Sequence, residues 1–137
     1  MSGAERLVVH VDGGARGNPG PAAIAAVVST PDGEIVEEHG ERIGEATNNV
    51  AEYRALLLGL HRARARGARE VELVGDSELV VRQVRGEYKV KDDALKALYA
   101  KVVKALAEFD SWSIRNVPRE ENAEADRLVN VALDAAS

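Results

Sequence analysis

The sequence contains no cysteine, so it has no disulfide framework, no zinc site built on thiolates and no cysteine nucleophile. It also lacks an apolar run long enough to span a membrane. The first ten residues, MSGAERLVVH, lack the basic start and long apolar middle of a secretion signal. We therefore expect a soluble, cytoplasmic protein that acts as a monomer and has no membrane partner.

Linkers, internal repeats and low-complexity stretches are missing as well. We expect residues 1–137 to form a single domain, which is long enough to bury a hydrophobic core. The net charge of −5 does not by itself indicate a polyanionic partner, but residues 77–104 hold seven basic and four acidic side chains. Such a region can bind phosphates, although taken alone it equally fits an ordinary solvated helix.

Hydrophobic periodicity predicts nine elements in the order βββαβααβα. Strands are expected at residues 6–12, 21–30, 34–43, 69–76 and 111–117. Helices are expected at residues 47–66, 77–85, 92–109 and 121–136. The turn residues at 31–33 favour an antiparallel return, and Gly67 and Gly86 are expected to end two helices. The order predicts an α/β fold, with a mixed five-stranded sheet whose first three strands are antiparallel and whose faces carry helices.

The stretch VDGGARGNPG, at residues 11–20, places a single carboxylate beside a glycine-rich segment. A nucleotide cradle is excluded, because prolines and a strand follow where such a cradle needs a helix. Two interpretations stay open. The glycines could permit a wide turn with positive φ, or Gly13, Gly14 and Gly17 could let a bulky ligand approach the backbone next to Asp12.

Four acids occupy positions where a site could form. Asp12 is expected to end the first strand and Asp76 to end its parallel neighbour, at the same edge of the sheet. Glu52 lies in the first turns of the long helix and Asp126 lies on the last helix. Two carboxylates side by side repel each other unless a cation lies between them.

Each acid also has an ordinary explanation when it is taken alone. Asp76 could cap the helix that follows it, and Glu52 could complement a helix dipole. Asp126 could lie with Asn122 and Asn130 in a solvated polar stripe. As a set, however, hard oxygen ligands suit Mg²⁺ or Mn²⁺, and four carboxylates can hold two such ions about 4 Å apart for phosphoryl transfer.

Four segments, in order, resemble the ribonuclease H type 1 family, whose members cut the RNA strand of RNA–DNA hybrids. They are VDGGARGNPGPAAIAAVV, TNNVAEYRALLLGL, GDSELVVRQV and NAEADRLVN. The resemblance implies a ribonuclease H-like fold and a catalytic quartet of Asp12, Glu52, Asp76 and Asp126. It further implies two Mg²⁺ ions, with Mn²⁺ as a substitute, and products that carry 5′-phosphate and 3′-hydroxyl ends. Asp12, Glu52 and Asp76 would hold one ion, and Asp12 and Asp126 the other.

The resemblance also implies a set of substrate contacts. They are Gly13, Gly14, Ala15, Asn18, Thr47, Asn48 and Asn49. The asparagines match positions that touch base edges and ribose 2′-hydroxyls in the minor groove, where a protein can distinguish RNA from DNA. Thr47 matches a position that holds a phosphate of the DNA strand, and helix capping is the alternative role for this threonine.

The sequence departs from many members of the family at two places. The basic insertion after the third motif is missing, and Lys89, Lys91 and Tyr88 are expected to replace part of it. The loop before the last helix has no histidine, so Arg119 or Glu120 would take its place, with Asn122 as a further auxiliary residue. A short branch of the family shares these features, and some of its members also cut double-stranded RNA.

Two alternatives of a different kind accompany this interpretation. One is a catalytically silent module of the same fold that binds hybrid or double-stranded RNA, and the other is a junction resolvase. The presence of all four acids argues against a silent module. The asparagines that match positions near 2′-hydroxyls favour an RNA substrate over branched DNA.

Overall fold

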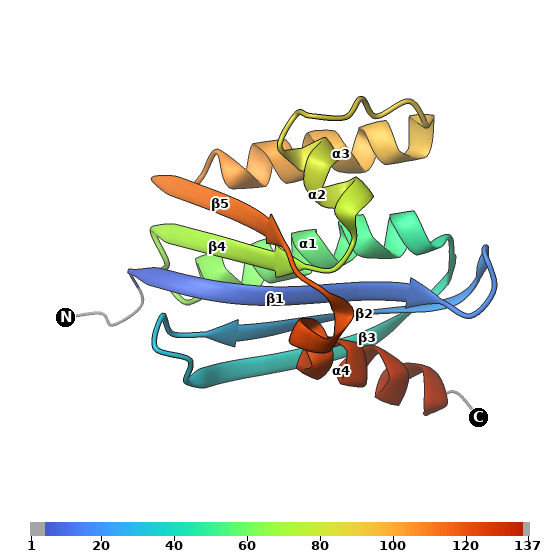
Figure 1. The fold of residues 1–137 in the computed structure, drawn as a ribbon, viewed down its shortest axis with the longest axis horizontal. Coiled ribbons are helices and arrows are strands. Elements are labelled where there is room, and N and C mark those ends of the chain that lie inside the picture. Colours follow the sequence, from blue (N-terminus) through green and yellow to red (C-terminus); the bar gives the residue numbers. More distant parts are fainter. Residues whose placement is uncertain (1–4, 136–137) are drawn as a thin grey trace.

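The structure is a computed structural model that describes residues 5–135. One sheet has the strand order β3-β2-β1-β4-β5 (Figure 1). The strands are β1 Arg6–Ala15, β2 Gly20–Ser29, β3 Ile35–Ala46, β4 Glu70–Gly75 and β5 Ser111–Asn116. The first three strands pair antiparallel, and β1, β4 and β5 pair parallel. The expected mixed sheet is therefore confirmed.

Four α-helices and one 3-10 turn connect and flank these strands. They are α1 Asn48–Ala65, α2 Glu78–Val84, α3 Asp93–Leu106, the 3-10 turn Arg119–Asn122 and α4 Ala123–Asp134. The helix expected at 121–136 thus begins with a 3-10 turn, and the end of the expected range lies outside the described residues. Within residues 5–135 no helix is long and apolar enough to cross a bilayer.

Local signals explain where the helices begin and end. The hydroxyl of Thr47 accepts a hydrogen bond from the backbone N–H of Val50, so Thr47 is the N-cap of α1. Gly67 and Gly86 have positive φ just after α1 and α2 end. A glycine in this position lets the chain leave the helix without a steric penalty.

Helices cover the two faces of the sheet unequally (Figure 1). Alternate residues of β2, from Ala22 to Val28, pack toward α1 in the larger core. The residues between them, Ala23, Ala25 and Val27, pack against α4. Because β2 is buried on both faces, its sequence is a nearly continuous apolar run of small residues.

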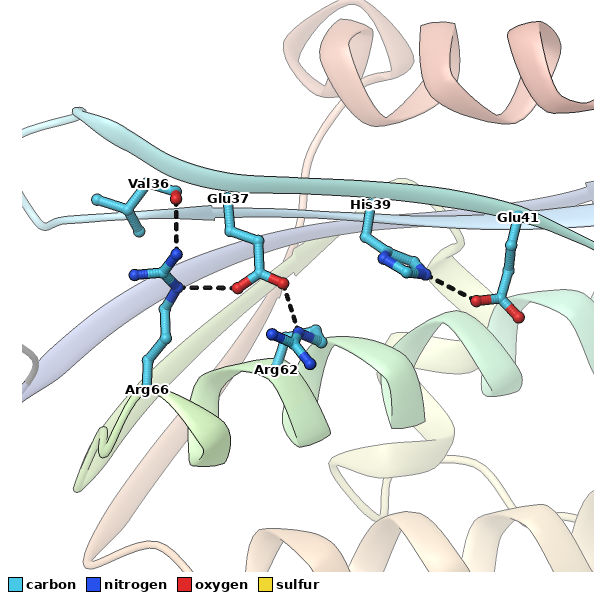
Figure 2. Close-up of polar contacts among 6 residues, drawn as sticks. All are labelled: Val36, Glu37, His39, Glu41, Arg62 and Arg66. Atoms are coloured by element: carbon cyan, nitrogen blue, oxygen red, sulfur yellow. Dashed lines mark hydrogen bonds and ion pairs between the residues drawn. The ribbon is translucent and has the colours of Figure 1, made fainter.

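Polar contacts hold the C-terminal half of α1 to strand β3 (Figure 2). The carboxylate of Glu37 accepts hydrogen bonds from both Arg62 and Arg66. Arg66 also donates to the carbonyl of Val36 at 2.8 Å. These contacts fix α1 against the edge strand, and α1 in turn carries one of the candidate acids.

Candidate active site

Strands β1 and β4 bring Asp12 and Asp76 to the same edge of the sheet. The last residues that pair between these parallel strands are His10 and Val74. Asp12 lies two residues after His10, and Asp76 lies two residues after Val74. The expectation that Asp12 ends the first strand is wrong. β1 continues through residues 13–15, because these residues still pair with β2.

Helix α1 supplies Glu52 and brings it next to β1. The Glu52 carboxylate accepts a hydrogen bond from the backbone N–H of Gly13 at 3.2 Å, and the first turn of α1 contains no acidic residue. A helix-dipole role therefore does not explain Glu52. A Cβ on Gly13 would lie 2.3 Å from the carbonyl oxygen of Ala51, so this glycine lets α1 contact β1 closely.

The fourth acid, Asp126, lies in the first turn of α4. The Nδ2 of Asn122 donates to the carbonyl of Val11 at 2.8 Å, and this asparagine is only 1% exposed. Asn122 is therefore not part of a solvated stripe. Its hydrogen bond holds the start of α4 beside β1, which sets the position of Asp126 relative to the other acids.

Three of the acids form a compact group of possible metal ligands. One carboxylate oxygen from each of Asp12, Glu52 and Asp76 lies within 4.8 Å of the other two. Asp126 lines the same cavity, which has a volume of about 490 Å³. The capping role considered for Asp76 belongs to Ser77, whose hydroxyl accepts a hydrogen bond from the N-terminal turn of α2.

Burial and mutual repulsion make these carboxylates difficult to ionise. Burial, together with the nearby charges of Asp76 and Asp126, raises the pKa of Asp12 to about 8. Burial and the charge of Asp12 raise the pKa of Glu52 well above its usual value. Burial also raises the pKa of Asp76, although the positive charge of Arg119 opposes this shift. A bound cation would relieve the repulsion.

Arg119 and Glu120 differ in their relation to this cavity. Arg119 lines it, and its guanidinium lies 3.3 Å from the carboxylate of Asp126. Glu120 is exposed and is not among the residues that line the cavity. Of the two residues considered for this loop, Arg119 is thus the one that faces the acids.

The predicted substrate contacts of the first loop and of α1 are adjacent in space. The side-chain oxygen of Asn48 accepts a hydrogen bond from the N–H of Ala15 at 2.8 Å. The side-chain oxygen of Asn18 accepts from the N–H of Asn48 at 3.0 Å. Asn49 is the second residue of α1, next to Asn48. A Cβ on Gly14 would lie in ordinary van der Waals contact with the Oδ1 of Asn48 and the Cγ1 of Val129, each at 3.9 Å, so a small side chain fits there.

The two lysines predicted to contact the substrate lie outside the cavity that contains the acids. Lys89 and Lys91 are exposed in the segment 85–92, which connects α2 to α3 without an intervening helix. Lys89 lines a separate pocket with Tyr88 and Tyr99. Neither lysine lines the cavity that contains the acids.

Sequence reasoning missed one cationic side chain of the cavity, Arg16, together with the part of α4 that faces it. The available signal was a single basic residue inside the glycine-rich segment. The contacts of this arginine involve Asn130 and Asp134, which are more than one hundred residues away, so no local pattern could indicate them.

Comparisons with known proteins agree with this geometry. Residues 10–132 match the family described as reverse transcriptase-like. The chain is 47% identical over 131 residues to ribonuclease HI of Halobacterium salinarum, covering 96% of this chain and 66% of that protein. It is also 47% identical to a bifunctional protein of Mycobacterium tuberculosis, covering 96% of this chain and 36% of the relative. The chain thus spans only part of the length of these relatives.

Solved structures give the same result. The crystal structure of RNase H1 from Halobacterium salinarum superimposes with a TM-score of 0.94 at 46% identity, covering 96% of this chain and 99% of that one. LC11-RNase H1, solved in complex with an RNA/DNA hybrid, superimposes with a TM-score of 0.91 at 45% identity, covering 95% and 98%. From its fold, its ordered motifs and these relatives, the chain belongs to the ribonuclease H type 1 family.

Proposed function

We propose that the protein is an endoribonuclease that hydrolyses the RNA strand of RNA–DNA hybrids and leaves 5′-phosphate and 3′-hydroxyl ends. The observation that carries this proposal is the group formed by Asp12, Glu52 and Asp76, with Asp126 on the wall of the same cavity. A similar protein has been solved with an RNA/DNA hybrid, which supports the substrate class.

The acids suit divalent metal ions of the hard type. All of the candidate ligands are carboxylate oxygens, which favour Mg²⁺ or Mn²⁺ over softer metals. Asp12, Glu52 and Asp76 would hold one ion, and Asp12 and Asp126 would hold a second. When bound, such ions lower the pKa of the attacking water and stabilise charge on the leaving 3′-oxygen.

Other residues of the chain prepare this site. The N–H of Gly13 orients the Glu52 carboxylate, and Asn122 holds the helix that carries Asp126. Each of these contacts reduces the reorganisation needed when substrate binds. Arg119 contributes a permanent positive charge beside the acids and can contact a phosphate, but it cannot serve as a proton shuttle near neutral pH.

We assign recognition of RNA to the glycine-rich segment at residues 11–20 and to the start of α1. Because the oxygen of Asn48 is engaged by the loop backbone, its amide nitrogen is the group oriented to donate to a base edge or a 2′-hydroxyl. Asn18 and Asn49 would contact the same minor groove, and Thr47 would contact a phosphate of the DNA strand. Gly14 lines the cavity without a side chain, which would allow the groove to approach the backbone.

The short connection between α2 and α3 bears on the choice of duplex. Without a basic insertion, exposed side chains such as Lys89 and Lys91 would have to bind the DNA strand. We therefore propose weaker binding of hybrid than in relatives that carry the insertion, and additional cleavage of double-stranded RNA. The enzyme would act in the cytoplasm as a monomer.

A strand-resolved cleavage assay tests the proposal. Purified protein is incubated with Mg²⁺ or Mn²⁺ and end-labelled RNA–DNA, RNA–RNA, DNA–DNA and branched DNA substrates. Cleavage of the RNA strand is expected, EDTA should abolish it, and Asp76→Asn should reduce it by several orders of magnitude. Binding of hybrid without cleavage in either metal would instead identify a silent binding module, and an Asp76→Asn protein as active as the parent would disprove the assigned site.

A further inference from the structure

Arg16 is a cationic side chain that lines the active-site cavity together with Asn130 and Leu133 of α4. Its Nη2 lies 2.8 Å from the carboxylate of Asp134 and donates to the side-chain oxygen of Asn130 at 3.3 Å. Both partners belong to the C-terminal half of α4. The guanidinium therefore connects the segment between β1 and β2 to α4 along the wall of the cavity.

The backbone at Arg16 is held in a tight turn. The N–H of Arg16 donates to the carbonyl of Pro21 at 2.8 Å. Gly17 has a φ of +103°, and a Cβ on Gly20 would lie 2.2 Å from the Arg16 carbonyl oxygen. Because of these glycines, the segment folds tightly around the backbone of Arg16. The Arg16 side chain therefore starts from an ordered backbone, and ligand binding would not have to bear the entropic cost of ordering this segment.

The ion pair with Asp134 is weakly held. The side chains of Arg16 and Asp134 are 50% and 69% exposed. Exposed pairs of this kind contribute little to stability, because water screens the charges and both side chains lose conformational freedom. A phosphate group can compete with Asp134 for the guanidinium of Arg16, since a phosphate can accept two parallel N–H hydrogen bonds from this planar group.

The position of this contact relative to the acids suits an extended polyanion. Asp126, Asn130 and Asp134 follow one another at four-residue intervals on α4, and the rise from the first to the last is about 12 Å. At about 3.4 Å of rise per nucleotide in one strand, this distance corresponds to a few nucleotides. A duplex with its scissile phosphate at the acids would thus present another phosphate near Arg16.

We propose that Arg16 binds a backbone phosphate of the nucleic-acid substrate, a few nucleotides from the scissile phosphate, and that Asp134 holds the guanidinium in place until the duplex binds. This inference rests on the proposed function, because it takes the substrate to be a duplex that lies across the four acids. It adds a contact that sets affinity and salt dependence and leaves the chemical step to the acids.

The test measures binding of a fluorescently labelled RNA–DNA hybrid by anisotropy, with Asp76→Asn as the background that prevents cleavage. Affinity is determined between about 50 and 300 mM salt, because each neutralised phosphate contributes a slope of about 0.9 in log affinity against log salt. Arg16→Ala should lower this slope by about 0.9, and Arg16→Lys should restore most of it. Asp134→Ala should leave affinity unchanged or increase it.

Arg64→Ala is the matched control, because Arg64 has the same side-chain exposure of 50% and pairs with Glu108 far from α4. This control should not change the slope. If Arg16 only tethered the loop to α4, Arg16→Ala and Asp134→Ala would weaken binding alike, and that result would overturn the inference. An unchanged slope for Arg16→Ala would overturn it as well.

Cleavage by the otherwise unmodified protein separates this inference from the proposed function. If the parent protein cuts hybrid and Arg16→Ala leaves the slope unchanged, only the phosphate contact is wrong. If the parent protein binds hybrid through Arg16 but cuts no RNA, the contact stands and the proposed hydrolysis is wrong. If the parent protein binds no hybrid, both fail.

Discussion

Replacing Asp12 by asparagine should stabilise the metal-free protein. The carboxyl of Asp12 is only 6% exposed, and burial with the nearby charges of Asp76 and Asp126 raises its pKa from 3.8 to about 8. Its ionised form is therefore costly in the folded state when no cation is bound. Asparagine has nearly the same shape and no charge, so the substitution removes this cost and keeps the packing.

The sign and size of the effect follow from the difference in pKa between the folded and unfolded states. Because the folded pKa is the higher one, the contribution of this carboxyl to stability is fully present below about pH 4 and is lost as the pH rises to about 8. At pH 7 the loss amounts to at most about 4 kcal/mol, from three pH units at 1.4 kcal/mol each. Since neighbouring acids share the repulsion, we expect Asp12→Asn to stabilise by about 2 to 4 kcal/mol, or by roughly 10 °C in Tm.

The assay is urea and thermal unfolding of both proteins in EDTA at several pH values between 4 and 8.5. The two stability curves should converge near pH 4 and separate as the pH rises. Added Mg²⁺ should stabilise the parent protein more than Asp12→Asn, because the ion binds only the folded state of an intact site. Glu34→Gln is the control, because it removes an exposed charge from the turn after β2. This variant should change the free energy of unfolding only slightly, and by the same amount at every pH.

Two results would refute this reasoning. The first is a stability difference that does not depend on pH, since it would mean that the carboxyl is ionised equally easily in both states. The second is a parent protein more stable than Asp12→Asn at pH 7 in EDTA. Either result would show that burial and the neighbouring charges do not raise the pKa of Asp12 in the metal-free site.

The remaining predictions concern glycines and the asparagine that holds α4. Gly13→Ala should destabilise by about 2 to 3 kcal/mol in urea unfolding, because its Cβ would lie 2.3 Å from the Ala51 carbonyl oxygen, whereas Gly14→Ala should be nearly neutral. Equal effects at the two positions would contradict the contact with α1. Gly14→Val should weaken hybrid binding measured by anisotropy and leave stabilisation by Mg²⁺ intact; the reverse pattern would be evidence against a role in substrate approach. Asn122→Ala should cost about 1 to 3 kcal/mol, since it leaves the buried Val11 carbonyl unpaired, and should slow cleavage; unchanged kcat would show that this bond does not position α4.

Much of the fold could be predicted because its signals are local. Thr47 caps α1, and Gly67 and Gly86 leave their helices with positive φ, as turn and cap chemistry indicates. The parallel pairing of β1 with β4 followed from the strand–helix–strand order. These features depend on neighbouring residues and on the handedness of the chain.

The end of β1 could not be predicted, for a physical reason that involves its partner strand. Glycines disfavour strands when they are judged alone, so the strand was expected to stop at Asp12. In the structure Gly13 and Gly14 continue the strand, because Ile24 and Ala23 of β2 pair with them. Backbone hydrogen bonds to a strand that follows later in the chain thus override the local preference.

The glycines of VDGGARGNPG also have different roles, which the sequence could not separate. Gly17 meets the expectation of positive φ. Gly13 instead accommodates the backbone of α1, and Gly20 accommodates the carbonyl of Arg16. Gly14 lines the cavity, and a Cβ there would meet ordinary van der Waals contacts at 3.9 Å. Each role depends on which atoms approach the missing Cβ, and tertiary packing alone determines that.

By itself the sequence determined the order of the elements, the mixed sheet and the identity of four acids in family order, since periodicity, turn chemistry and motif spacing are properties of short segments. Only the tertiary structure decided that Asp12, Glu52 and Asp76 approach within 4.8 Å and that Asn122 is buried against β1. It also decided that Arg16 pairs with Asp134 of α4. These contacts join residues far apart in the chain, and their geometry arises from how α1 and α4 pack on opposite faces of one sheet.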